Sequence, residues 1–153
     1  MTRTRVTSFS EIETEFIQRV HTVVWCSFAT LDTQNRVRSR LLHPLWEGAT
    51  GWIATRRHSP KEQQLAHNPH ASLAYVADIV KPVYVDCLAE WDDTTASKER
   101  IWETFKAAAP PLGYDPALFF HSVDHPDYGL LRLTPWRIEL FDATGETKIW
   151  HRR

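Results

Sequence analysis

Thr55-Arg56-Arg57-His58-Ser59-Pro60-Lys61-Glu62 is the stretch in which the chain passes from an expected strand into an expected helix. Ser59 suits the N-cap, and Pro60 suits the first helical position, where its missing N–H costs no hydrogen bond. Glu62 follows the cap by three residues, which is the spacing of a capping box. The stretch therefore predicts a helix that begins at residue 60.

A helix start at this place would be a favourable site for an anion. Its first backbone N–H groups lack partners within the helix, and the helix dipole adds a partial positive charge. The same stretch carries three cations and two hydroxyls that could contact a phosphate: Arg56, Arg57, Lys61, Thr55 and Ser59. We predict a phosphate-binding site. The alternative is a common capping box whose basic residues are merely solvated.

The composition describes an ordinary globular protein without a strong overall charge. The chain has 153 residues, enough for one domain (1–153) with a full core. Its net charge of −1 excludes a general attraction to nucleic acid or anionic membranes. Residues 1–8 lack the apolar core of a signal peptide, and no apolar run is long enough to span a membrane. Cys26 and Cys87 lie in apolar runs, so we expect reduced thiols and a cytoplasmic protein.

A second basic stretch precedes the first. Arg36, Arg38 and Arg40 alternate with smaller side chains, so a strand over 36–46 would place three guanidinium groups on one face. The turn residues 47–51 then predict a hairpin into a strand at 52–55. That pairing would bring Arg40 across the sheet to the predicted phosphate site. Arg40 is also expected to be partly buried, and a buried arginine needs an anionic partner. For Arg36 and Arg38 the alternative is an exposed basic face.

The rest of the sequence predicts a mainly β, α+β fold. Further strands are expected at 22–31, 71–76, 83–91, 130–133 and 136–141, and helices at 10–20, 60–67, 94–108 and from 115. Short turns favour antiparallel pairing, so six or seven strands should form a small closed barrel with flanking helices. His121 and His125 have no third ligand nearby in the sequence, so no metal site is predicted. Five tryptophans are expected in the core: Trp25, Trp52, Trp91, Trp102 and Trp136.

Four segments resemble a known family, the pyridoxamine 5′-phosphate oxidase-like, FMN-binding split-barrel proteins, and in particular its general stress protein branch. The segments are Asn35–Trp46, Ala54–Thr55 with Ser59–Lys61, Leu65–Pro69 with the strand that follows, and Leu131–Leu140. The resemblance implies an antiparallel split barrel and a homodimer with FMN held at the interface. It also implies that Arg40 and Lys61 bind the phosphate and that Ser59 and Thr55 donate hydrogen bonds. Backbone at Leu41, Leu42, Ala54 and Thr55 would line the flavin ring.

The function implied by the resemblance is transfer of hydride or electrons to a small substrate, with the redox chemistry supplied by FMN. Two alternatives remain open: a reductase using the deazaflavin F420, whose acidic tail could use Arg36 and Arg38, and a protein that only binds flavin or haem. No residue is named as catalytic. The family's oxidase carries a C-terminal arginine- and histidine-bearing segment with no match here, so vitamin B6 oxidation is not expected. Asn35 and Pro60 also depart from the family's usual glycine and arginine.

Overall fold

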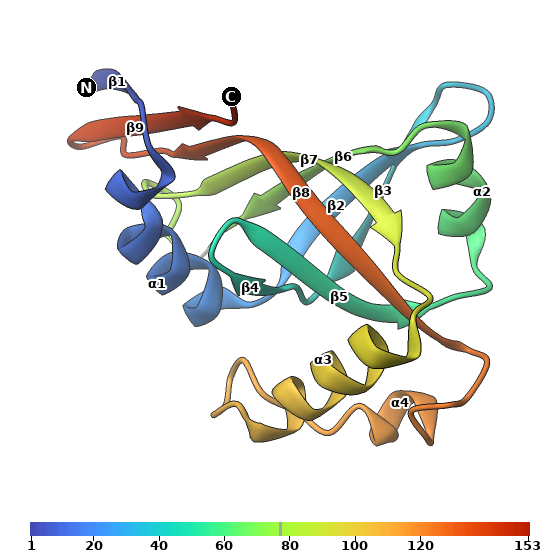
Figure 1. Cartoon of the computed structure of the whole chain (residues 1–153). Coiled ribbons are helices and arrows are strands. Elements are labelled where there is room, and N and C mark those ends of the chain that lie inside the picture. The colour runs from blue at the N-terminus through green and yellow to red at the C-terminus, as the bar shows by residue number, and fades with distance from the viewer. Residues whose placement is uncertain (77) are drawn as a thin grey trace.

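The computed structural model describes residues 1–76 and 78–153, and in this part of the chain strands predominate (Figure 1). The strands are β1 (Thr2–Val6), β2 (Cys26–Leu31), β3 (Val37–Leu42), β4 (Leu45–Glu47), β5 (Thr50–Arg56), β6 (His70–Tyr75), β7 (Val83–Trp91), β8 (Tyr128–Leu140) and β9 (Glu146–His151). The α-helices are α1 (Glu13–Val23), α2 (Pro60–His67), α3 (Thr95–Ala107) and α4 (Ala117–Phe120), with a 3-10 turn at Phe9–Glu11.

The strands form one mixed sheet in the order β1-β9-β8-β7-β6-β2-β3, with β5 also paired to β8 and β4 to β5. All pairs are antiparallel except β1 with β9. The α+β split-barrel prediction is confirmed, but the closed barrel is wrong because β3 and β4 do not pair with each other. The described residues form nine strands, where six or seven were predicted. The polar end segments add β1 and β9 and residues 36–46 form two strands, whereas the predicted strands 130–133 and 136–141 are the single strand β8.

The predicted hairpin turn is present, but it joins β5 to the short β4, so the predicted pairing of β5 with the arginine-bearing strand is wrong. β3 pairs with β2, with Arg40 opposite Phe28, whereas β5 pairs with the short β4, with Trp52 opposite Leu45. The break between β3 and β4 falls at His43-Pro44, where proline lacks the N–H that a continuous ladder would need. Arg40 therefore lies on the edge strand β3, and any contact with the helix start must come from the packing of α2.

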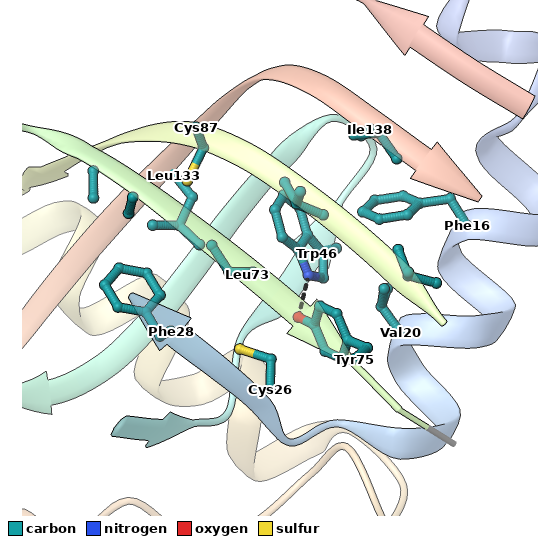
Figure 2. Close-up of a cluster of buried hydrophobic side chains, with 14 of the residues drawn as sticks. Phe16, Val20, Cys26, Phe28, Trp46, Leu73, Tyr75, Cys87, Leu133 and Ile138 are labelled. Carbon is teal, nitrogen blue, oxygen red and sulfur yellow. Dashed lines mark hydrogen bonds between the residues drawn. The ribbon is translucent and has the colours of Figure 1, made fainter. Parts of the chain in front are cut away.

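The core fills the inner face of the curved sheet beneath α1. Phe16 of α1 meets Trp46 edge to face, with ring centroids 5.1 Å apart, and Trp46 Nε1 donates to the Tyr75 hydroxyl at 2.9 Å (Figure 2). Cys26 and Cys87 are buried free thiols, as predicted, and burial raises the pKa of Cys26 to about 12. These buried side chains come from both layers and hold the sheet against the helix.

Two smaller clusters lie outside the sheet, where α3 packs against β5 and β8. Trp52 belongs to one and Trp102 to the other, both buried as predicted, and Trp91 is partly buried against the main core. The prediction is wrong for Trp25 and Trp136, which are 54% and 42% exposed. Trp25 occupies the link between α1 and β2, and Trp136 follows buried Pro135 on the alternate face of β8. No helix among residues 1–76 and 78–153 is long and apolar enough to span a membrane.

Candidate functional site

The predicted helix start is present, but the predicted capping box is not. α2 begins at Pro60 with Ser59 at the N-cap in extended conformation. The Ser59 hydroxyl donates to the Arg56 carbonyl oxygen at 3.0 Å and accepts no hydrogen bond from the helix. Glu62 instead pairs with Arg57 at 3.0 Å, because the nearby guanidinium attracts its carboxylate. The backbone N–H groups of this helix start are thus not capped by the Ser59 side chain.

Lys61 is a buried cation that pairs with no acidic side chain in the part of the chain that the structure describes. Its side chain lies on the face of α2 that packs against β2, and it is only 8% exposed. Within residues 1–76 and 78–153, no hydrogen bond or ion pair joins its Nζ atom. Burial lowers the pKa of Lys61, and the positive charges of Arg40 and Arg56 lower it further. A charge in this position needs an anion for compensation.

Arg40 is fixed beside this lysine by two uncharged side chains. Arg40 Nη2 donates to Gln64 Oε1 at 2.6 Å, and Nη1 donates to Thr30 Oγ1 at 2.7 Å. The Thr30 hydroxyl in turn donates to Gln64 Oε1 at 2.6 Å. Burial also lowers the pKa of Arg40, with repulsion from Arg38 as a second cause. The contacts orient the guanidinium toward α2 without neutralising it, so its positive charge stays available to a ligand.

The other arginines of the two basic stretches differ in how far they are neutralised. Arg57 pairs with Glu62 and Asp93 and lies over the Trp91 ring at 4.6 Å, so its charge is compensated. Arg56 pairs with Asp127 at 2.9 Å, although its side chain is largely exposed. Arg36 pairs with Asp32 at 2.9 Å. Arg38 has no acidic partner among the described residues but is exposed to solvent, so the positive charge that is both unpaired and partly or fully buried lies at Arg40 and Lys61.

An apolar cavity of about 450 Å³ has Arg56 in its wall. Arg56 is also one of the two cations whose charge lowers the pKa of Lys61, so the cavity lies near that lysine. Leu42 of β3 and Ala54 of β5, two of the residues predicted to line a flavin ring, are in its wall. The other lining residues are Val23, Val24, Trp25, His43, Arg56, Pro111, Tyr114, Phe119 and Phe120. The structure thus combines an apolar cavity with a neighbouring cluster of positive charge.

The side chains of two predicted site residues, Leu41 and Thr55, do not line the apolar cavity. Leu41 is 70% exposed, because it alternates with Arg40 and Leu42 onto the outer face of β3. Thr55 is buried and alternates with Ala54 and Arg56 on β5, so its side chain does not line the cavity. Their predicted backbone contacts with the ring remain predictions.

His43 lines the cavity and was not predicted. Its ring contacts the rings of Trp25 and Tyr114, with centroids 5.4 and 5.3 Å away. Burial lowers the pKa of His43 to about 4, so the imidazole is neutral at pH 7. Its Nε2 atom is buried and has no hydrogen-bond partner among the described residues. His121 and His125 lie 5.5 Å apart by ring centroids, but no cluster of three metal-ligating side chains includes them in the described chain.

Lys61→Met should stabilise the ligand-free protein, because it removes a buried uncompensated charge and keeps the length of the side chain. The lowered pKa means that the folded state disfavours the charged lysine at neutral pH. That penalty begins to fall as the pH rises through the lowered folded-state pKa, and it is gone above the unfolded-state value of 10.5. We expect a gain of about 1 kcal/mol, or roughly 2–4 °C in melting temperature. Thermal unfolding at pH 7 measures it. Lys106→Met on the exposed end of α3 is the control, and an equal gain there would contradict the interpretation.

No protein-family model and no curated protein matches the sequence. Solved structures do match. A general stress protein 26-related protein of the pyridoxinephosphate oxidase family from Clostridium acetobutylicum aligns with a TM-score of 0.74 and 16% identity, covering 92% of this chain and 94% of that one. The chain has the split-barrel fold of the pyridoxamine 5′-phosphate oxidase-related proteins. The resemblance inferred from the sequence is thereby confirmed at the level of the fold.

Other split barrels of similar fold differ in the cofactor that their descriptions name. A pyridoxamine 5′-phosphate oxidase-related, FMN-binding protein from Nostoc punctiforme aligns with a TM-score of 0.70 and 16% identity over 95% of this chain and 94% of that one. A haem-binding protein from Mycobacterium smegmatis aligns with a TM-score of 0.66 and 16% identity, over 88% of this chain but only 56% of that one. The split-barrel fold therefore does not by itself identify the cofactor, which can be inferred only from the side chains of the site.

Proposed function

We propose that this split barrel binds FMN and acts as an oxidoreductase on a small molecule. The observation that carries the proposal is the buried Lys61, which has no counterion among the described residues and lies within the influence of Arg40. A phosphate group would compensate both charges. The adjoining apolar cavity, with Leu42 and Ala54 in its wall, fits the ring system of the same cofactor. A phosphate at one end and an apolar planar ring at the other is the chemistry of FMN.

The residues of this chain would bind and orient the cofactor. Arg40 can offer two parallel N–H donors to phosphate oxygens, and its contacts with Gln64 and Thr30 hold the guanidinium in place. Lys61 would add a point charge. The apolar wall would exclude water from the ring. Bound flavin would supply the redox chemistry, taking electrons from a reduced nicotinamide or another donor.

We further propose a homodimer in which a second copy covers the edge strand β3. Val37 and Leu41 are each 70% exposed on its outer face, an unusual exposure for two large apolar side chains on one short strand. Trp136 and Val37 line a shallow groove on this same surface. A partner would bury these side chains and could close the cofactor site. The two free cysteines fit a cytoplasmic setting.

Vitamin B6 oxidation is not part of the proposal, because the C-terminal residues are engaged in the sheet. Arg152 donates to the backbone carbonyls of Pro135 at 2.7 Å and Ala49 at 3.1 Å. Its guanidinium also lies over the Trp150 ring, 5.3 Å from the centroid. None of these residues lines the apolar cavity, so the end of β9 offers no substrate contact there.

A visible absorption spectrum tests the cofactor. The purified protein is incubated separately with FMN, F420 and hemin, desalted, and compared with the protein before addition. We expect flavin absorbance to be retained after FMN. Retention of F420 alone would replace FMN by the deazaflavin, and retention of hemin alone would overturn the proposal in favour of a haem-binding protein. Oxidation of a reduced nicotinamide by the FMN-loaded protein then separates an enzyme from a flavin carrier.

A further inference from the structure

We infer that Gln64 and Thr30 are positioning residues that make the cation site selective for a doubly charged terminal phosphate. The inference rests on the proposed function, because it concerns the phosphate site of the same cofactor. It adds which edge of the Arg40 guanidinium meets the ligand and which ligand charge the site prefers. Two features carry it: the hydrogen bonds around Arg40 and the balance of charge at the site.

The hydrogen bonds around Arg40 have only one possible direction. A guanidinium donates and cannot accept, so the Gln64 atom that lies 2.6 Å from Arg40 Nη2 must be the amide oxygen. Thr30 Oγ1 accepts from Nη1 at 2.7 Å and donates its own proton to the same Gln64 oxygen at 2.6 Å. The three side chains form a closed ring of hydrogen bonds in which neither supporting residue carries a charge.

Thr30 and Gln64 occupy the end of the guanidinium that carries Nη1 and Nη2. Nη1 contacts the Thr30 hydroxyl and, at 3.2 Å each, the carbonyl oxygens of Phe28 and Arg38, so both of its N–H groups are used. Nη2 uses one N–H for Gln64. Its other N–H is parallel to that of Nε, and neither has a partner within residues 1–76 and 78–153. Because Nε is not a buried atom, this side edge can donate to two oxygens of a phosphate.

Burial holds both supporting side chains in place. Thr30 is 2% exposed on β2, and Gln64 is 5% exposed on the face of α2 that packs against β2. Water therefore cannot compete for their hydrogen bonds to Arg40, and the backbone of two different elements fixes the two acceptors. The guanidinium is held before a ligand arrives, so little conformational entropy is lost when the side edge binds one.

The charge of the site matches two negative charges on one ligand. Neither Arg40 nor Lys61 has a carboxylate partner in the described part of the chain, and Glu62, the one acidic residue of α2, pairs with Arg57 at 3.0 Å. A glutamate at position 64 would have the shape of Gln64 but would neutralise Arg40. A phosphate monoester carries about 1.5 to 2 negative charges at pH 7. A singly charged ester would leave one of the two cations uncompensated.

Gln64→Glu tests the inference, and Gln63→Glu is the matched control. Both substitutions add one negative charge to α2, but Gln64 contacts Arg40 whereas Gln63 is exposed. Flavin fluorescence at pH 7 measures the affinity for FMN and for riboflavin 5′-sulfate, which has the same ring and one charge fewer. We expect the wild type to prefer FMN at least about tenfold, the value of one charged hydrogen bond. Gln64→Glu should weaken FMN binding at least about tenfold and reduce the preference below about threefold, and Gln63→Glu should change neither affinity by more than about twofold.

Gln64→Met separates the position of Arg40 from the charge of the site. It removes the acceptor of Nη2 and adds no charge, so it should weaken both flavins by a similar factor and keep the preference for FMN. A purely structural role of Gln64 would give the same preference in the Glu and Met variants, and that result would overturn the inference. Equal affinity of the wild type for the two flavins would overturn it as well. Circular dichroism of each ligand-free variant checks that it is folded.

Phenyl phosphate and phenyl sulfate distinguish this inference from the proposed function, because neither carries a flavin ring. Their binding to ligand-free protein at pH 7 is measured by isothermal titration calorimetry. If the wild type binds no flavin, the proposed function fails. A preference for phenyl phosphate that is lost in Gln64→Glu would still support the inference in that case. Equal binding of the two esters, or binding of neither, would overturn it.

Discussion

Arg40→Ala combined with Lys61→Ala will reduce FMN affinity by at least about 100-fold. Each residue offers a charged hydrogen bond to phosphate, and such bonds contribute about 1.5–3 kcal/mol each. Their joint loss of roughly 3 kcal/mol or more corresponds to a factor of about 100 or more in the dissociation constant. Quenching of flavin fluorescence on titration with protein measures the affinity. The fold should persist, because neither side chain belongs to the apolar core.

Arg36→Ala with Arg38→Ala is the matched control, since both arginines are exposed on the same side of the chain as Arg40 and flank the start of β3. We expect less than about a threefold change in FMN affinity, because exposed charges contribute little. Unchanged FMN binding in the Arg40/Lys61 variant would show that the phosphate site is misassigned. If the Arg36/Arg38 control variant instead lost much of its affinity for F420 but kept its affinity for FMN, this would indicate a cofactor with a longer acidic tail.

Trp46→Ala will destabilise the protein by about 3–5 kcal/mol, the usual cost of removing a large aromatic side chain from a core. Trp46 is 3% exposed and packs edge to face on Phe16. Its removal would also leave the buried Tyr75 hydroxyl without the hydrogen bond drawn in Figure 2. Since single domains are stable by only about 5–15 kcal/mol, much of the total would be lost. Urea unfolding followed by circular dichroism measures the free energy.

Trp136→Ala is the control for this prediction, because it removes the same side chain from a position that is 42% exposed. We expect Trp136→Ala to lower the free energy of unfolding by less than about 1 kcal/mol if the chain is monomeric under the conditions used. Trp46→Phe keeps an aromatic ring, so the loss of unfolding free energy should lie between those of Trp46→Ala and Trp136→Ala. Equal destabilisation by Trp46→Ala and Trp136→Ala would contradict the assignment of Trp46 to the core.

The sequence predicted local features of the fold well and distant pairings poorly. Ser59-Pro60 identified the start of α2 correctly, because proline at the first helical position acts through its immediate neighbours. Residues 36–46 were interpreted as one strand, although His43-Pro44 divides them into β3 and β4. Which strands pair is decided by packing across the whole sheet. For that reason the neighbour of β5 proved to be β4, with β8 on its other side.

The proximity of Arg40 and Lys61 was predictable, whereas the residues that orient Arg40 were not. Arg40 and Lys61 stood out because of charge and resemblance. Thr30 and Gln64 orient Arg40 from positions 10 and 24 residues away in the sequence, and uncharged polar side chains give no periodic signal. Gln64 did offer one indication, since it follows Lys61 by three residues and so lies on the same face of a helix.

The parallel pairing of β1 with β9 has a consequence for biosynthesis. Thr2 lies opposite Glu146, and the register continues to Val6 opposite Trp150, so the first strand of the chain pairs with the last (Figure 1). While the ribosome synthesises the intervening residues, β1 has no partner within the sheet. The strand must wait as an extended, solvated segment, which its polar residues Thr2, Arg3, Thr4 and Arg5 permit. This sheet edge can therefore be completed only after β9 has emerged from the ribosome.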